Sequence, residues 1–219
     1  MIKLGFDVFE RSVSRYLHRT ESRDRGQGWR TFLKNHQRAI FSIDFFYSYT
    51  LSFKRVIGLV VIDHHQRLIL HTAVTAYPTV DWTIQQLLHA FPGECPYRYL
   101  ICDNDQTFGD RLEREVQNLL GVKVVKTNKG NPWMNAITER TIGSIRRELL
   151  DHVIVLHEQH LAGLLTEYAA YFNSRRTHMG IQKDCPISRA VHSRPTPTAR
   201  LQPQSILGGL HHNYLWSSA

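Results

Sequence analysis

One short stretch decides how the chain folds: Phe41-Ser42-Ile43-Asp44-Phe45-Phe46. Its apolar and aromatic residues predict a buried β-strand, which Asp44 interrupts. An ionised carboxylate without a partner is costly to remove from water, so something has to compensate its charge. The stretch therefore predicts a strand of the sheet core together with a chemically special position at Asp44.

The segments on either side predict the rest of the fold. Apolar runs predict strands at 39–47, 53–62, 68–75, 98–103 and 122–126, and helical periodicity predicts helices at 79–91, 108–120, 135–151 and 158–173. Three consecutive strands followed by alternating helices and strands are typical of an α/β fold. We therefore expect a mixed sheet flanked by helices.

The two ends of the chain differ from this core, which we place at residues 37–192. Residues 1–19 have apolar side chains at helical spacing and look like the second helix of a helix-turn-helix module, or like an amphipathic helix that docks on the next domain. No first helix precedes them, so we expect a remnant of a chain truncated at its amino end. The polar, arginine-rich segment 20–36 predicts a linker, and residues 193–219, rich in Pro, Gly, His and Ser, predict an irregular tail.

Composition narrows the class of protein. The chain has 219 residues, 42% of them hydrophobic, and its longest apolar run is far shorter than the ~20 residues that cross a bilayer. Its three scattered cysteines form no CxxC pair, so a reducing compartment fits and zinc is not expected. We expect a soluble, cytoplasmic protein that contacts no membrane.

Charge is unevenly distributed along the chain. Lys and Arg number 27 and Asp and Glu 19, for a net charge of +8. Residues 1–38 carry a charge of +5, residues 39–110 a charge of −3 and residues 111–219 a charge of +6. Two basic flanks around an acidic middle indicate a bound polyanion with carboxylates gathered at the centre, although a solvated basic surface has the same composition.

Three acids stand at positions that favour a shared site. Asp44 interrupts its strand, Asp103 ends the next acid-bearing strand, and Glu139 lies early in a helix and off its apolar face. Each acid alone could be a turn residue, a cap or an ion-pair partner. Together, three hard oxygen donors suit Mg²⁺ or Mn²⁺.

The spacing of these acids resembles a known family. Glu139 follows Asp103 with 35 residues between them, as in the catalytic Asp, Asp and Glu of the superfamily of retroviral integrases and insertion-sequence transposases. The resemblance covers roughly residues 37–190. It also includes Asn131-Pro132 and Asn135, the run from Arg146 to Leu149, the run from Tyr171 to His178, and Pro186. It implies a ribonuclease-H-like fold with a DDE catalytic site at Asp44, Asp103 and Glu139.

Two positions depart from the family pattern. Asp105 stands where the family usually has Gly, which creates a second candidate for the middle acid. We favour Asp103 because its interval to Glu139 fits and because it ends the apolar strand. Thr177 replaces the Pro that commonly separates the family's Arg and His.

The resemblance implies a DNA transposase or integrase. Two divalent ions held by the three acids can stabilise both the entering and the departing oxygen of a phosphoryl displacement, so no protein nucleophile is needed. Water would cut the 3′ end of a mobile element, and the new hydroxyl would attack target DNA. The alternatives are a catalytically silent DNA-binding remnant that interferes with a full-length transposase, and a ribonuclease-H-like nuclease.

Basic residues predict the contacts to DNA. The candidates for backbone phosphate contacts are Lys126, Lys129, Arg140, Arg146, Arg147 and Arg15, each of which could instead be solvated surface. Arg176 and His178 could approach the site or close the fold. The implied chemistry predicts a homo-oligomer on DNA, because two DNA ends normally require at least two active subunits, and we expect association with a bacterial nucleoid.

Overall fold

The computed structural model describes residues 28–103, 109–127 and 135–217, and the chain divides into two compact units after His36. In the first unit the described element is helix α2, Trp29–His36. His36 stacks on Phe32 one turn earlier, with 4.7 Å between ring centroids, and its Nδ1 lies 3.0 Å from the Phe32 carbonyl. The last part of the predicted linker is therefore helical. The predicted helix at 1–19 lies outside the described residues.

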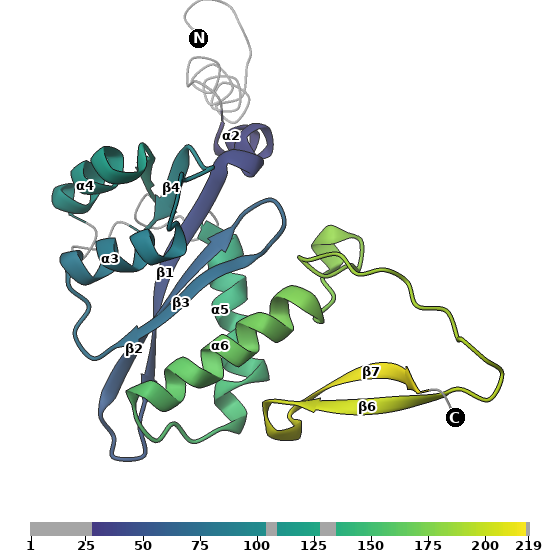
Figure 1. Cartoon of the computed structure of the whole chain (residues 1–219). Helices are drawn as coiled ribbons and strands as arrows, with labels where there is room; N and C mark the ends of the chain where they lie inside the picture. The colour runs from purple at the N-terminus through teal and green to yellow at the C-terminus, as the bar shows by residue number, and fades with distance from the viewer. Residues whose placement is uncertain (1–27, 104–108, 128–134, 218–219) are drawn as a thin grey trace, which may run out of the picture. The chain divides into compact units, whose positions relative to one another are not determined.

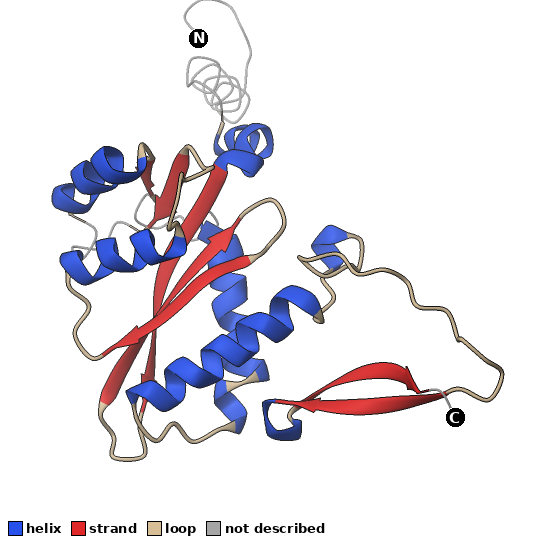
Figure 2. Cartoon of the chain, in the orientation of Figure 1, coloured by secondary structure: helices blue, strands red, loops and turns tan. Residues whose placement is uncertain are grey.

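The second unit is built on a five-stranded sheet of order β3-β2-β1-β4-β5 (Figures 1 and 2). Its strands are β1 Ile40–Tyr49, β2 Arg55–Asp63, β3 Ile69–Thr75, β4 Tyr99–Cys102 and β5 Lys123–Lys126. Strands β1, β2 and β3 pair antiparallel, whereas β1 pairs parallel with β4 and β4 with β5. The predicted mixed sheet is confirmed.

Helices cover both faces of this sheet. They are α3 Val80–Ala90, α4 Asp110–Leu120, α5 Ala136–Glu148 and α6 Glu158–Ser174, with short 3-10 helices at Gln37–Ala39, Leu150–His152 and Met179–Ile181. Apolar residues of α3 and α4 pack with Phe41 and Ile43 of β1, and those of α5 and α6 pack with Phe46. Because side chains alternate along a strand, Ser42 and Asp44 share the Phe46 face and therefore face the α5 layer. In the described part of the chain, no helix has both the length and the apolar character needed to span a membrane.

The C-terminal segment forms a β-hairpin and is not the irregular tail that we predicted. Strands β6, Arg200–Ile206, and β7, His211–Ser217, pair antiparallel around a turn at Leu207–Gly209. All three residues of this turn have positive φ angles, 52° at Leu207, 65° at Gly208 and 98° at Gly209, and glycine adopts this conformation without strain. The sequence pattern did not predict β6, because the strand is exposed along most of its length and contains Pro203, and Pro normally argues against a strand.

A glycine fixes the packing of the central strands. Gly58 of β2 lies opposite Phe46 of β1, and a Cβ atom added at position 58 would lie 2.2 Å from Phe46 Cζ. The phenyl ring therefore occupies the space that any side chain at position 58 would need. Phe46 is buried, so the ring has no solvent to move into.

We predict that Gly58→Ala lowers the free energy of unfolding by about 2 kcal/mol, because the added methyl group overpacks the core. The measurement is urea denaturation followed by circular dichroism. Gly163→Ala is the matched control, because Gly163 is exposed within α6 with nothing within 4 Å of an added Cβ. That variant should gain about 0.5–1 kcal/mol. Equal behaviour of the two variants would contradict the close packing.

Candidate active site

Asp44 lies in the middle of β1 and is partly exposed. Its Oδ1 accepts a hydrogen bond of 2.7 Å from the backbone N–H of Phe45. Ile43 and Phe46 are buried in the two core clusters, so the backbone around Asp44 is fixed. The hydrogen bond from Phe45 and the remaining exposure of Asp44 together offset part of the free-energy cost of removing this carboxylate from water.

Asp103 directly follows β4 and reaches the same face of the sheet. Ser42 of β1 pairs in parallel with Ile101 of β4, so the residues two positions further along, Asp44 and Asp103, are neighbours on one face if the register continues. Thr127, which follows β5, donates a hydrogen bond of 2.9 Å from Oγ1 to Asp103 Oδ1. The alternative middle acid, Asp105, lies outside the described residues.

Glu139 lies in the first turn of α5. It is exposed, yet partial loss of solvent at its carboxyl group, followed by the negative charge of Asp103, raises its pKa. The negative charge of Asp103 thus disfavours a second negative charge at Glu139. That Asp44, Asp103 and Glu139 form one site stays a prediction.

The three acids do not form a ready-made metal site in this structure. Within the described ranges, no three side chains of His, Cys, Asp or Glu lie close enough together to hold a metal ion. Asp44 and Asp103 each bond a neighbouring N–H or hydroxyl group instead. Carboxylates without a cation between them repel one another, which favours such separate arrangements.

A chain of buried hydrogen bonds holds the start of α5 against β1. Ser42 Oγ lies 2.5 Å from Thr138 Oγ1, and Thr138 donates a bond of 2.6 Å to Asn135 Oδ1. Asn135 Nδ2 in turn donates to the Ile43 carbonyl at 3.3 Å, and His64 Nε2 lies 2.7 Å from Ser42 Oγ. The residue next to Thr138 is Glu139, so this chain fixes the backbone that carries the third acid.

The direction of these bonds follows from counting donors. Because Thr138 gives its only proton to Asn135, its oxygen must accept from Ser42, and the Ser42 oxygen must then accept from His64 Nε2–H. Burial and then the positive charge of Arg67 lower the pKa of His64 to about 3, so the ring is neutral near pH 7. Sequence reasoning missed Ser42, Thr138 and His64. The available signal was a Ser two residues before Asp44 within an apolar run.

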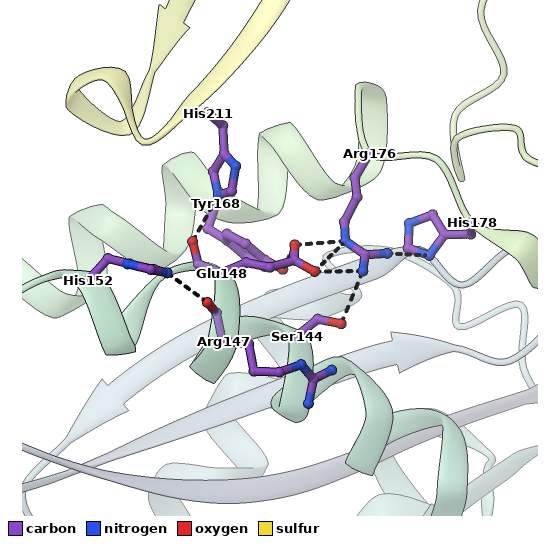
Figure 3. A network of polar contacts seen from close by, with 8 residues as sticks. All are labelled: Ser144, Arg147, Glu148, His152, Tyr168, Arg176, His178 and His211. Carbon is purple, nitrogen blue, oxygen red and sulfur yellow. Dashed lines mark hydrogen bonds and ion pairs between the residues drawn. The ribbon is translucent and has the colours of Figure 1, made fainter.

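At the opposite end of α5, an ion pair joins the helix to the segment that follows α6 (Figure 3). Arg176 donates from Nε and Nη2 to Glu148, the shortest distance being 2.6 Å, and the Tyr168 hydroxyl donates to the same carboxylate at 3.0 Å. His211 of the hairpin donates from Nε2 to the Glu148 carbonyl at 2.8 Å. Burial alone would raise the pKa of Glu148, but the bonds and charge of Arg176 outweigh it and keep the pKa below its usual value. Of the two roles considered for Arg176, this geometry favours closing the fold.

The predicted DNA-contacting residues have different surroundings. Lys126 lies 3.4 Å from Asp110 and 3.5 Å from Glu113, so carboxylates of α4 already offset its charge. Arg140, Arg146 and Arg147 are exposed on α5. Lys129 and Arg15 lie outside the described residues.

Comparison with known proteins agrees with this fold and with the resemblance. Residues 120–186 match the family model described as an integrase core domain. The putative transposase InsK for insertion sequence element IS150 of Escherichia coli (strain K12) is 30% identical over 132 residues, which are 58% of this chain and 46% of that protein. The chain thus spans about half the length of this curated relative.

Solved structures share the architecture at low identity. A chain of the simian T-cell lymphotropic virus intasome has a TM-score of 0.54 and 14% identity, covering 83% of this chain and 67% of that chain. The catalytic domain of Mos1 mariner transposase has a TM-score of 0.54 and 17% identity, covering 64% and 74%. The catalytic core domain of HTLV-2 integrase in complex with magnesium has a TM-score of 0.50 and 16% identity, covering 68% and 93%.

The fold is therefore an α/β ribonuclease-H-like core, as predicted. More particularly, residues 120–186 match an integrase core domain, which confirms the resemblance read from the sequence. The structural likenesses establish the fold alone, and the roles of individual acids remain predictions.

We predict that His64→Gln makes stability less sensitive to acid. The folded-state pKa of His64, about 3, lies below the ordinary value of 6.5, so the unfolded chain takes up the proton first. This contribution to stability is complete above about pH 6.5 and declines as the pH falls toward 3, reaching a loss of about 2 kcal/mol at pH 5. Denaturant titrations at pH 7.5 and 5 measure it.

At pH 7.5, His64→Gln should have a lower free energy of unfolding than wild type. Between pH 7.5 and pH 5, its free energy of unfolding should fall by about 2 kcal/mol less than that of wild type. The exposed His192 provides a control, since His192→Gln removes a histidine without touching the Ser42 network. Identical pH responses of His64→Gln and wild type would show that His64 is not held neutral.

We predict that Arg176→Ala lowers the free energy of unfolding by about 2 kcal/mol, because it leaves the Glu148 carboxylate partly buried without its partner. The value is below that of a fully buried pair because both side chains retain about a quarter of their exposure, 23% and 25%. Arg175→Ala removes a neighbouring positive charge and should change stability by less than about 0.5 kcal/mol. Equal losses would exclude the ion pair as the cause.

Proposed function

We propose that this chain is a DNA transposase or integrase that cuts the 3′ ends of a mobile element and joins them to target DNA. Asp44, Asp103 and Glu139 would be its catalytic acids. The observation that supports the proposal is the parallel register of β1 and β4, which would make Asp44 and Asp103 neighbours on the face that α5 covers if it continued two residues beyond the Ser42–Ile101 pair. The interaction between Asp103 and Glu139 supports the third member.

The donor set fits Mg²⁺ or Mn²⁺. Three carboxylates supply hard oxygen atoms, and the family match and the magnesium-bound HTLV-2 relative support a divalent cation. Two such ions, when bound, would stabilise charge on the entering and departing oxygens of the phosphoryl group. In this proposal the chain holds Asp44 on strand β1, Asp103 directly after strand β4 and Glu139 on an anchored helix, so that little reorganisation is needed.

DNA is the proposed partner. The basic surface of α5 next to Glu139 supports contacts with backbone phosphates, and joining two element ends to a target would require at least two subunits. We propose that the protein acts as a homo-oligomer on bacterial DNA in the cytoplasm. The intasome relative is itself an assembly on this fold.

One observation favours a second candidate, a DNA-binding protein without catalysis. In the described residues the acids do not come together as a metal-binding group. A strand-transfer assay with pre-cut ends and Mn²⁺ separates the two functions. Joined products can come only from a catalyst, whereas a ribonuclease-H-like nuclease would give cut strands without joined ones.

We predict that Asp44→Asn, Asp103→Asn and Glu139→Gln each reduce strand transfer by at least about 100-fold while leaving DNA affinity intact, because each loses a charged oxygen ligand. A gel assay of labelled pre-cut ends measures transfer, and fluorescence anisotropy measures binding. Mg²⁺ should raise the melting temperature of wild type more than that of any of the three variants.

Asp151→Asn is the matched control, because Asp151 is exposed in the 3-10 helix that follows α5. It should keep full activity and the full Mg²⁺ response. Asp105→Asn tests the middle acid. If it abolishes transfer while Asp103→Asn does not, the assignment of Asp103 is wrong, and transfer retained by Asp44→Asn or Glu139→Gln would refute the site.

A further inference from the structure

A basic cavity of about 390 Å³ lies along α5, on a different flank from Glu139. Four arginines line it: Arg67 from the turn between β2 and β3, Arg140 and Arg147 from α5, and Arg176 from the segment after α6. No Asp or Glu is among the described residues that line it. We call it the arginine pocket; Figure 3 shows Arg147 and Arg176 from it.

The positive charge of this pocket is mostly unbalanced. Arg176 is paired with Glu148, but in the described part of the chain no carboxylate lies within 4 Å of the charged groups of Arg67, Arg140 or Arg147. Burial, then the charge of Arg140, lowers the pKa of Arg67, while Asp63 opposes this shift. Two guanidinium groups that repel each other in a partly buried cavity would be stabilised by an anion between them.

His178 adds a donor that lacks an acceptor. Arg176 Nη1 donates to His178 Nδ1 at 3.0 Å, so Nδ1 is unprotonated and the neutral ring carries its proton on Nε2. Burial and then the charge of Arg176 lower the pKa of His178; an interaction of the ring with the Phe172 backbone opposes this shift, but the net lowering favours the neutral form. Nε2 is buried and has no hydrogen-bond partner in the described structure, although His178 lines the cavity. A buried donor of this kind calls for an acceptor.

The donor set specifies the chemistry of the ligand. Guanidinium groups match the oxygen pairs of a phosphate, and the Ser144 hydroxyl and His178 Nε2–H add neutral donors. A volume of about 390 Å³ leaves room for a phosphate together with part of an attached sugar. Carboxylates fit less well, because they offer fewer oxygens to donors that come from three separate segments.

The position of the pocket relates it to the candidate acids. Arg140 follows Glu139 directly, and consecutive helical residues are rotated by about 100° around the axis. Arg140, Ser144 and Arg147 recur at helical spacing and form one stripe, while Glu139 starts another. A strand that crosses α5 could therefore place one phosphate in the pocket and a neighbouring segment beside Glu139.

We propose that the arginine pocket binds a backbone phosphate of DNA, anchored by Arg67 and Arg140 and completed by His178. The proposal deepens the proposed function and rests on it for the identity of the strand. Of the anchoring residues, Arg67 was not among the sequence-predicted DNA contacts. It lies far from α5 in sequence and is brought there by the turn between β2 and β3.

We predict that Arg67→Gln weakens binding of duplex DNA about tenfold at low salt and makes the slope of log K against log salt concentration less negative by about 0.9. The measurement is fluorescence anisotropy in EDTA at several salt concentrations. Arg111→Gln removes an equal charge from the exposed pair with Asp81 and should keep the wild-type slope. Equal slopes for all three proteins would overturn the proposal.

A second measurement identifies the source of the phosphate and guards against misfolding. At constant ionic strength, inorganic phosphate should raise the melting temperature of wild type and Arg111→Gln but not of Arg67→Gln. If phosphate stabilises the three proteins in this pattern while Arg67→Gln binds DNA as tightly as wild type, then the pocket binds free phosphate and the DNA proposal is wrong. Neither readout requires catalysis, so loss of strand transfer alone would count against the proposed function and not against the pocket.

Discussion

The buried hydrogen bonds from His64 through Ser42 and Thr138 to Asn135 are the constraint on which the candidate site depends. They join three segments: the turn after β2, the centre of β1 and the start of α5. Each hydroxyl donates once and accepts once, so the arrangement is fully satisfied only in one relative position of strand and helix. A half-satisfied version would leave a buried polar group unpaired, which is costly. This requirement fixes Glu139 relative to Asp44 more strictly than apolar packing would.

The far end of α5 is constrained by charge instead. The Glu148 carboxylate accepts hydrogen bonds from Arg176 and Tyr168, and its carbonyl group accepts one from His211 of the hairpin. His211 also stacks on Tyr171 of α6, with centroids 4.3 Å apart. The helix is thus held at its start by neutral hydrogen bonds and at its end by an ion pair, with Ile142 and Ile145 packed in the core between them. A helix held at both ends can present a side chain in its first turn at a fixed place.

The sequence predicted the local elements well because they depend on local patterns. The apolar run around Asp44 and the short strand before Asp103 were both readable. Contacts between distant segments were not, because no pattern links Ser42 to Thr138 or Arg67 to Arg140. The hairpin was missed for a different reason. Strand β6 is exposed along most of its length and contains Pro203, and the glycines in the turn also occur in irregular tails.

The electrostatics of α5 connect the two proposed sites. On one flank, Glu139 and Asp103 repel each other, which disfavours their shared charge until a cation lies near. On the next flank, Arg67 and Arg140 repel each other, so the positive charges on both are disfavoured until an anion lies near. The same hydrogen-bonded network holds a member of each pair. His64, three residues before Arg67, is bonded through Ser42 to Thr138, which directly precedes Glu139 and Arg140. A nucleic acid strand with its cations carries both opposite charges, so one ligand could relieve both repulsions at once.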